Sequence, residues 1–320
     1  MTAREFDPHI ASPTTVDPHI AAAAQLACLL EASAAKPGNV SPGVHFGDTT
    51  YTDFLASAAA IGAPLGSAGI DTLGTTIRRA VQSTRRWTSA NTNLGIILLL
   101  APLARAAARR LSGPGPASRE NDAVDADELR QSLRQVLANT TVDDAREAYA
   151  AIRLASPGGL GSAREQDVAN EPTVTLTDAM RLAADRDGVA REYATDFQTT
   201  FEIATPTLVR ARQAGLDWND AVVETFLTLL ATCPDTHIAR RAGQLVADDV
   251  TRRARAVLDS GGVRSPLGRA AIIAMSDALR DERNRANPGT TADITTAALF
   301  VVLVGGGWHT TNGGLDAASR

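Results

Sequence analysis

Apolar side chains recur every three or four residues along most of the chain, which is the spacing of amphipathic helices. No segment alternates apolar and polar residues over the length of a strand. A first helix is predicted from Asp17, an N-cap residue followed by Pro18 at the first helical position, to Ser33. The same spacing predicts further helices over about 51–62, 70–87, 91–111, 126–138, 141–154, 177–186, 189–204, 217–232, 235–259, 265–284 and 292–304. The pattern therefore predicts an all-α fold, built as a single compact multi-helix domain.

The breaks between these segments indicate where the domain begins and ends. Residues 1–16 are expected to form a flexible leader, because no periodic apolar pattern precedes the first helix. Residues 17–308 are expected to form the all-helical domain, and a stretch rich in Gly, Pro and charged residues predicts a loop insertion at about 112–125. Residues 309–320 are expected to be a C-terminal tail.

Composition supports a helical protein and narrows its partners. Aromatic residues make up only 4% of the chain, whereas Ala, Leu and Arg, which favour helices, are abundant. The net charge of −5 offers no overall positive field for nucleic acid or anionic membranes. No apolar run reaches the roughly 18 residues that span a bilayer. We therefore expect a cytoplasmic protein that binds neither nucleic acid nor membrane.

Polar junctions that contain glycine interrupt the helices at residues 31–38, 43–48, 91–95, 235–243 and 287–293. They contain no classical phosphate-binding loop, dinucleotide-binding glycine pattern, zinc-protease motif or nucleophile elbow. The third and fifth junctions each open a predicted helix with Asn and Gly, and free N–H groups at such helix starts bind anions. The same residues could simply cap helices or form turns, so the spacing leaves both interpretations open.

Two charged residues of the first junction are unusual. Glu31 lies near the C-terminal end of an apolar helix, where the helix dipole disfavours a negative charge unless something compensates it. Lys36 is the only lysine in the chain and lies beside Pro37 and Gly38. Lys36, Mg²⁺ or a ligand could each compensate the charge of Glu31. The residues alone thus indicate a helical enzyme or binding protein with loops suited to phosphate.

Taken in order, these junctions resemble the motifs of the triphosphoribosyl-dephospho-CoA synthase family. The first has the family's Glu-x-Ser-(three residues)-Pro-Gly pattern, and the second has its Gly-x-His pattern followed by an Asp. The fourth is similar to its Asp-Thr/Ser-Asn-(three residues)-Arg-x-Gly stretch, and the fifth to its Ser/Asn-Pro-Gly-(two residues)-Ala-Asp stretch. The third departs from the family's Asn-Thr-His-Lys-Gly, because Asn93 and Leu94 replace the His and the Lys. The resemblance extends from about residue 20 to residue 304.

The resemblance implies an all-helical catalytic domain that uses ATP as a ribosyl donor. In that reaction the 2′-hydroxyl of dephospho-CoA attacks C1′ of the ATP ribose, adenine leaves, and the triphosphate stays on the transferred sugar. Catalytic roles are expected for Glu31, His45, Asp48 and Asp235, and Asp48 and Glu31 are also expected to bind Mg²⁺. The residues expected to bind the nucleotide or the substrate are Ser33, Lys36, Gly38, Asn91, Thr92, Asn93, Gly95, His237, Arg240, Arg241, Asn287, Gly289 and Asp293.

Two alternatives remain open beside this reading. The departure at Asn93 and Leu94 is compatible with a divergent ATP-dependent enzyme of another cofactor pathway, such as one that makes a pterin- or furan-type one-carbon carrier. The chain could also be a non-catalytic helical protein that binds a nucleotide. For the enzyme, the expected partners are ATP, dephospho-CoA or another alcohol acceptor, and a second copy of the chain in a possible homodimer.

The resemblance also makes predictions about space and energetics. The first and last motifs, at 31–48 and 287–293, should meet in the fold. Lys36 and either Arg240 or Arg241 should face the same cavity as Asn91, so that Lys36→Ala weakens ATP binding and leaves the melting temperature nearly unchanged. The variants Asp48→Asn and Glu31→Gln should each lower turnover about a hundredfold or more.

Overall fold

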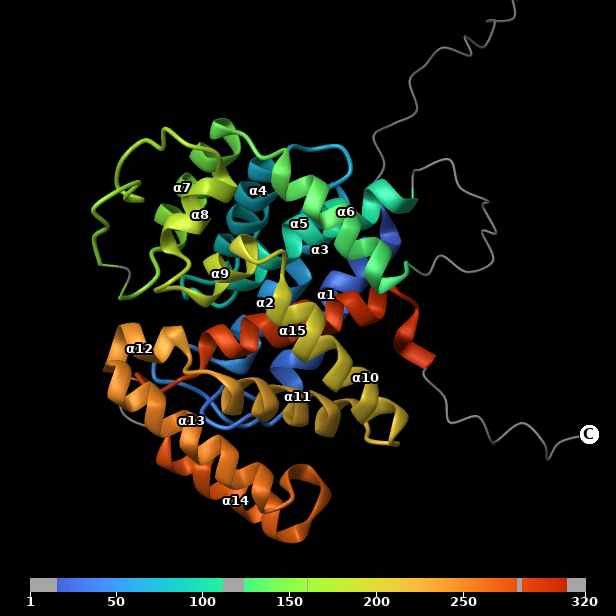
Figure 1. Cartoon of the computed structure of the whole chain (residues 1–320), viewed down its shortest axis with the longest axis vertical. Coiled ribbons are helices and arrows are strands. Elements are labelled where there is room, and N and C mark those ends of the chain that lie inside the picture. The colour runs from blue at the N-terminus through green and yellow to red at the C-terminus, as the bar shows by residue number, and fades with distance from the viewer. Residues whose placement is uncertain (1–15, 112–123, 160, 281–283, 310–320) are drawn as a thin grey trace, which may run out of the picture.

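The computed structural model describes residues 16–111, 124–159, 161–280 and 284–309. Throughout these residues the regular structure is helical, and the only β-type pairing is an isolated bridge between Ser41 and Val44 (Figure 1). The prediction of an all-α fold is confirmed. None of the described helices is long and apolar enough to cross a membrane. The expected leader (apart from Val16), the core of the expected insertion and the expected tail (apart from His309) lie outside the described residues.

The helices agree with most of the predicted segments to within a few residues. The first half of the chain forms α1 (Pro18–Ser33), α2 (Tyr51–Ala60), α3 (Gly62–Gly66), α4 (Leu73–Arg85), α5 (Leu94–Leu111), α6 (Ala126–Ala138) and α7 (Val142–Ala155). The second half forms α8 (Leu176–Ala183), α9 (Gly188–Ala194), the π-helical η1 (Thr199–Ala204), α10 (Thr205–Gln213), α11 (Trp218–Thr232), α12 (Thr236–Ala242), α13 (Gln244–Asp259), the 3₁₀ turn η2 (Gly262–Arg264), α14 (Pro266–Ala278), α15 (Gly289–Val304) and the 3₁₀ turn η3 (Gly307–His309).

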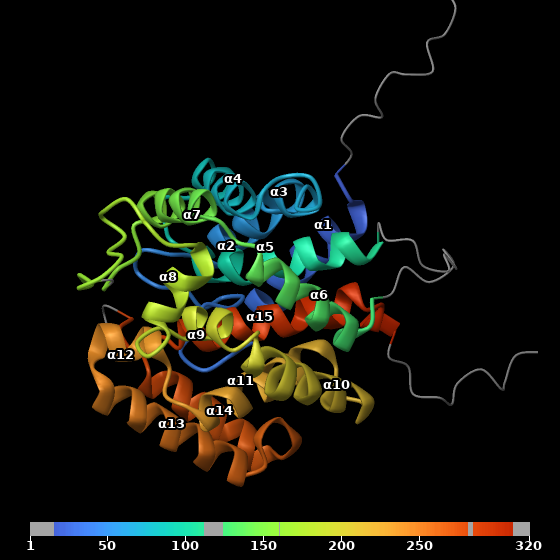
Figure 2. The same cartoon turned by 45° about the horizontal axis from the view of Figure 1, so that its top comes forward.

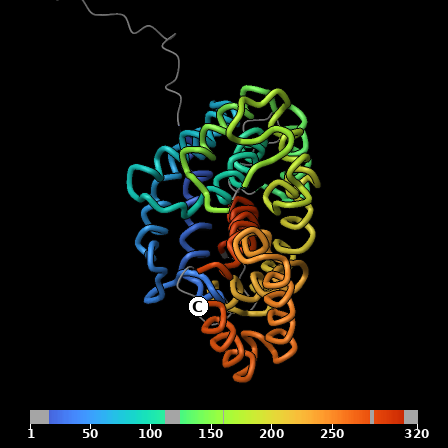
Figure 3. The backbone as a smooth tube through the Cα atoms, turned by 90° about the vertical axis from the view of Figure 1, so that its left-hand side faces the viewer, coloured from blue at the N-terminus to red at the C-terminus, as the bar shows by residue number. Residues whose placement is uncertain are grey.

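Helix α15 forms the centre of the molecule. Apart from Gly289 and Asp293, every residue of this helix is buried. Its sequence is apolar around the whole circumference, as expected of a helix that other helices surround. α1, α5, α10 and α11 pack against it, and Figure 3 shows α15 (red) enclosed by the other elements. Because α1 packs along α15, the first and last motifs meet, as predicted.

The other helices form two groups on opposite sides of α15 (Figure 2). On one side, α4 packs against α3, α5 and α7. On the other side, α11, α13 and α14 pack against one another in succession. The short helices α9 and α12 contact α15 near its N-terminal end, and α9 also contacts α5. This arrangement brings the starts of several helices together beside the beginning of α15.

Local signals explain where most helices begin. The Asp17 side chain accepts hydrogen bonds from the backbone N–H groups of His19 (2.9 Å) and Ile20 (3.0 Å), which confirms it as the N-cap of α1. The single helix predicted over 235–259 is wrong, because the chain forms α12 and α13 on either side of Gly243. Gly243 has a φ of +95°, a conformation that favours glycine and interrupts the helical hydrogen bonds.

The single helix predicted over 189–204 is also wrong, because the chain turns sharply between α9 and η1. Asp196 and Phe197 adopt left-handed φ angles of 51° and 57°. The Glu192 carboxylate, which is fully buried, accepts hydrogen bonds from the N–H groups of Thr199 (3.1 Å) and Thr200 (2.9 Å) and from the Thr200 hydroxyl (2.6 Å). A side chain therefore satisfies backbone groups that a continuous helix would satisfy internally.

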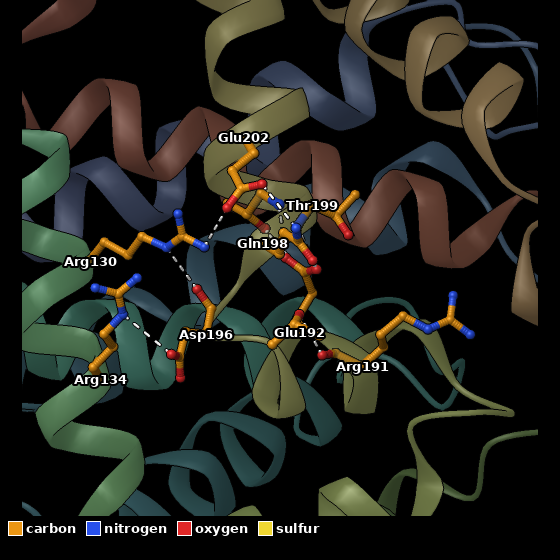
Figure 4. Close-up of polar contacts among 10 residues, drawn as sticks. Arg130, Arg134, Arg191, Glu192, Asp196, Gln198, Thr199 and Glu202 are labelled. Atoms are coloured by element: carbon orange, nitrogen blue, oxygen red, sulfur yellow. Dashed lines mark hydrogen bonds and ion pairs between the residues drawn. The ribbon is translucent and has the colours of Figure 1, made fainter.

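Arginines from α6 stabilise this turn (Figure 4). Arg130 donates to the Asp196 carbonyl (3.1 Å) and to the Glu202 carboxylate (2.9 Å). Arg134 donates to the Asp196 carboxylate (3.3 Å). These contacts fix the end of α9, whose first turn lines the candidate site. They also hold the turn from which the chain continues through η1 into α10. The sequence pattern does not predict α10 as a separate helix.

Candidate functional site

A cavity of about 170 Å³ lies where the starts of α5, α9, α12 and α15 meet. At about 30 Å³ for each water molecule, this volume corresponds to about six water molecules, which is room for a small ligand group. Helices α7 and α8 and the segment between them complete the wall. Five residues expected to bind substrate line it, and they come from the third, fourth and fifth motifs: Asn91, Gly95, His237, Arg240 and Asp293.

One wall of the cavity is apolar. Leu94 and Leu98 of α5 contribute to it, as does Ile152 of α7. The remaining apolar lining comes from Pro157, Val168, Leu176, Ala179, Met180, Leu182, Ala183, Val189 and Ala190. The first-turn position of Leu94 is where the resembled family has a lysine, so the departure from the motif makes this wall more apolar. An apolar wall of this kind suits a flat ring system better than a charged group.

The remaining side chains of the lining are mostly polar or charged. Asn91 accepts a hydrogen bond from the Leu94 N–H (3.3 Å) and so caps the start of α5 while it lines the cavity. Arg240 forms an ion pair with Asp187, and both side chains line the cavity. Arg186 also lines the cavity and is exposed, which places a guanidinium at the solvent side. Cations are therefore present both within the cavity and at its edge.

His237 is a neutral imidazole at physiological pH. Burial lowers its pKa to about 4, and the positive charges of Arg240 and Arg241 act in the same direction. The ring lies against Gly289, where an added Cβ would come within 3.2 Å of it. Arg241 approaches the His237 Nε2 at 3.5 Å and donates to the Asn284 carbonyl at 3.4 Å, so it lies behind the histidine rather than in the cavity lining.

Asp293 is the carboxyl group at the inner end of the cavity. Burial raises its pKa well above the ordinary value, and the negative charges of Glu31, Asp235 and Asp187 raise it further. The carboxyl lies directly against Gly95 in the first turn of α5, where an added Cβ would come within 2.0 Å of an Asp293 oxygen. A glycine is therefore needed at this position for α5 and α15 to approach so closely.

Glu31 and Lys36 form a buried ion pair instead of facing the cavity. The Lys36 Nζ lies 3.1 Å from the Glu31 carboxylate and also donates to the Ala34 carbonyl at 3.1 Å. Both side chains are almost completely buried. The prediction that Lys36 faces the same cavity as Asn91 is wrong, because the charge of Glu31 at the end of α1 holds the lysine in the protein interior. Of the three cations considered, Arg240 alone lines the cavity.

Asp235 holds two helices together. Its carboxylate accepts hydrogen bonds from the N–H groups of His237 (2.8 Å) and Ile238 (3.0 Å) and thereby caps α12. It also accepts from the N–H and the hydroxyl of Thr291, both at 2.7 Å, and so ties α12 to the first turn of α15. A carboxylate with four donors does not fit the acid–base role expected of Asp235, and we assign it the positioning of His237.

His45 and Asp48 are both exposed and lie in the second half of the segment between α1 and α2. His45 accepts a hydrogen bond from the Tyr51 N–H at its Nδ1 (3.2 Å), and Asp48 accepts from the Thr49 hydroxyl (3.1 Å). Neither side chain lines the cavity. Because Asp48 is exposed and Glu31 is buried against Lys36, the expected magnesium site between these two carboxylates does not form. In the described part of the chain, no three His, Cys, Asp or Glu side chains are grouped so as to hold a metal ion.

The remaining expected binding residues support the site from outside its lining. Ser33 shares a hydrogen bond with the Tyr51 hydroxyl (2.8 Å), and the Gly38 N–H donates to the Ser276 hydroxyl (3.4 Å). Thr92 and Asn93 are buried next to the start of α5. Their side chains bond to those of Ser57 (2.5 Å) and Thr84 (3.1 Å), and Asn287 forms the turn that precedes α15 by accepting from the Gly289 N–H (2.9 Å).

Asp187 is a residue of the lining that the sequence analysis does not identify. One of its carboxylate oxygens pairs with Arg240, and the other accepts a hydrogen bond from the Ala190 N–H (3.0 Å) and so caps α9. The signal was available, because Asp followed by Gly before a helical segment is a common N-cap pattern. Its pairing with Arg240 was not available, since 53 residues separate the two. Tyr149 is a second missed residue of the lining, and its hydroxyl donates to the Gln166 carbonyl (2.6 Å).

Comparisons with known proteins point to one family. Residues 17–312 match the model of the CitG family, ATP:dephospho-CoA triphosphoribosyl transferase. A protein of Stutzerimonas stutzeri named probable 2-(5''-triphosphoribosyl)-3'-dephosphocoenzyme-A synthase is 34% identical over 113 residues, which are 35% of this chain and 38% of that protein. The protein of the same name from Pseudomonas aeruginosa strain UCBPP-PA14 is 33% identical over 125 residues, 38% of this chain and 42% of that protein. The chain thus matches less than half of the length of these relatives.

A solved structure is similar over a larger share of the chain. The crystal structure from Archaeoglobus fulgidus, also a probable triphosphoribosyl-dephospho-coA synthase by name, superimposes with a TM-score of 0.61 at 25% sequence identity. The match covers 80% of this chain and 99% of the archaeal chain. The fold is therefore shared with that protein over most of the chain.

Proposed function

Because the chain belongs to the ATP:dephospho-CoA triphosphoribosyl transferase family, we propose that it transfers the triphosphoribosyl group of ATP to an alcohol and releases adenine. The proposed acceptor is the 2′-hydroxyl of dephospho-CoA. The relatives carry this activity in their names, and the family match covers residues 17–312, which include all five motifs.

The observation that carries the proposal is the convergence of three motifs on one cavity. The segments 91–95, 235–243 and 287–293 are far apart in sequence, and each contributes lining residues. The cavity combines an apolar wall with a polar end, which is the arrangement expected for a nucleoside whose base is buried and whose sugar meets directed polar groups. A purely structural set of helix caps would not need an open space between them.

We place the nucleotide against Asn91, Gly95, His237, Arg240 and Asp293, because these are the expected binding residues that line the cavity. The other residues expected to bind substrate act by positioning the helices that carry these five. Mg²⁺ belongs to the proposal only as the counter-ion that ATP brings with its phosphates, since Glu31 is paired with Lys36 and Asp48 is exposed outside the cavity lining. The homodimer and the cytoplasmic location stay predictions.

A different alcohol acceptor is the second candidate. It is favoured by Leu94, which lines the cavity where the resembled family has a cationic lysine. Loss of that cation changes the charge beside the substrates without removing the apolar wall, and a change of acceptor with retention of ATP fits such a change.

The test is to incubate the purified protein with ATP and Mg²⁺, with and without dephospho-CoA, and to measure free adenine and the mass of the CoA product. Adenine in equal amount to a triphosphoribosylated product is the expected result. Adenine that forms only with another alcohol supports the second candidate. A protein that binds ATP and releases no adenine with any alcohol would be a non-catalytic nucleotide-binding protein, and the proposal would be wrong.

A further inference from the structure

Four carboxyl groups, two of which line the cavity, gather around the first turn of α15, and three of them have partners. Glu31 is paired with Lys36 at 3.1 Å. Asp187 is paired with Arg240, and Asp235 accepts four hydrogen bonds from α12 and the start of α15. Each of these three carboxyl groups therefore has a compensating cation or several hydrogen-bond donors inside the protein.

Asp293 is the fourth carboxyl, and it differs from the other three. Within the described part of the chain, it forms no hydrogen bond and no ion pair, although it is partly buried and lines the cavity. The groups that face it are Glu31 and Cys28 from α1, and Asp235, Asp187 and Arg240 from the segments around α9 and α12. Three neighbouring carboxylates against one facing arginine favour the protonated form.

We propose that Asp293 is the catalytic acid that donates a proton to the nucleobase as the base leaves C1′, an inference that rests on the proposed function. In this step the C1′–N9 bond breaks and its electron pair goes to the base. The Asp293 carboxyl proton passes to a ring nitrogen of the base, so that neutral adenine leaves. The acceptor oxygen forms the new bond to C1′ and releases one proton, which balances the proton that the base takes up.

The charges around the cavity set the direction in which ATP lies. The triphosphate carries several negative charges and is repelled from the end where the four carboxyl groups gather. The base carries none, and the apolar wall from α5, α7 and α8 accepts it. With the base against this wall, the phosphates extend toward Arg186, an exposed residue of the lining, and we place the glycosidic bond beside Asp293, which also lines the cavity.

The acid also matches the chemistry of the step. An unprotonated nucleobase is a poor leaving group from an oxocarbenium-like centre, and protonation of the base makes its departure easier. A carboxyl that holds its proton at neutral pH can supply it, as the acid of a glycosidase does, whereas an ordinary exposed Asp cannot. The raised pKa of Asp293 is the consequence of its burial among the other carboxylates, and it supports this role.

The experiment compares the wild-type protein with Asp293→Asn and with Asp259→Asn, a matched change at an exposed acid near the end of α13. Adenine release from ATP is measured with saturating acceptor between pH 5 and pH 9. For Asp293→Asn we expect kcat to fall about a hundredfold or more, which is the usual loss on removal of a general acid, and KM for ATP to change less than about threefold. The wild-type rate should decline as pH rises through the raised pKa of Asp293, and this decline should disappear in the variant. Asp259→Asn should behave as the wild type.

A thermal melt separates this role from a structural one. The raised pKa means that the folded protein loses stability as pH rises from the ordinary carboxyl value through the raised one, because the folded state holds the proton more tightly than the unfolded state. The neutral amide removes this effect, so Asp293→Asn should melt at the same temperature as the wild type or higher at neutral pH. A rate equal to wild type, or a low rate that keeps the wild-type alkaline decline, would overturn the inference alone. A wild-type protein that releases no adenine would overturn the proposed function together with it.

Discussion

Lys36→Met should destabilise the fold strongly, because it removes the partner of a carboxylate that is buried at the end of α1. The Lys36 Nζ and the Glu31 carboxylate are 3.1 Å apart and nearly inaccessible to solvent. At that separation, and with an effective dielectric constant of about 20, their attraction is about 5 kcal/mol. Removing one member of a buried pair typically destabilises a protein by about 3–5 kcal/mol, since the remaining charge stays unpaired. We therefore expect the free energy of unfolding to fall by about 3 kcal/mol or more and Tm to fall by roughly 6–10 °C.

The control is Arg253→Met, which removes an ion pair of similar length (2.7 Å) between Arg253 and Asp249 on the exposed surface of α13. Exposed pairs contribute less than about 1 kcal/mol, so this variant should melt within about 3 °C of the wild type. A double variant, Glu31→Gln with Lys36→Met, should recover much of the loss because no buried charge remains. Circular dichroism melts of the variants measure all three effects. If Lys36→Met melts no lower than the control while ATP affinity drops, the lysine faces substrate and the reasoning fails.

Three further outcomes can be checked with the same assays. Gly95→Ala should lower adenine release at least tenfold, because a Cβ there meets the Asp293 carboxyl at 2.0 Å. Gly47→Ala, where a Cβ meets nothing within 4 Å, should keep the wild-type rate. Equal rates for the two variants would contradict the close approach of Gly95 to Asp293. The His237 pKa of about 4 lies below that of a histidine in the unfolded chain, so the wild type should lose on the order of 3 kcal/mol of stability as pH falls from about 6.5 to 4. His237→Gln should lose clearly less stability over the same range. Parallel curves of stability against pH from chemical denaturation would refute the neutral, buried state of His237. Asp48→Asn should keep adenine release within about twofold of wild type, because Asp48 is exposed and outside the cavity; a hundredfold loss would restore it as a catalytic residue.

Much of the helical arrangement could be predicted from the sequence, because local interactions determine it. Asp17 caps α1 through its own side chain, and the boundaries predicted at 126–138 are those of α6. The break between α9 and η1 could not be predicted, since it depends on the buried Glu192 carboxylate and on arginines from α6. A helical pattern read along one segment contains no information about a side chain that arrives from another helix.

The candidate site could be predicted in part for the same reason. Asn91, His237 and Asp293 lie at or near helix starts, which are visible as Asn-, Asp- and Gly-containing junctions, and these residues do line the cavity. The position of Lys36 could not be predicted, because a lysine beside a glycine is equally compatible with a phosphate ligand and with a partner for Glu31. Only the packing of α1 against α15, which closes the protein around both charges, decides between them.

The central helix is also the last α-helix of the described residues, and this has a consequence for biosynthesis. The ribosome releases α1, α5 and α11 well before α15, which packs against all three. At about 5–20 residues per second, the interval between α1 and α15 is on the order of tens of seconds. Throughout this time the faces of α1, α5 and α11 that later contact α15 lack this partner, so we expect chaperones that bind exposed apolar surface to bind the nascent chain. Slowing translation ahead of Gly289 should therefore lower the yield of folded protein more than the same delay placed after Val304.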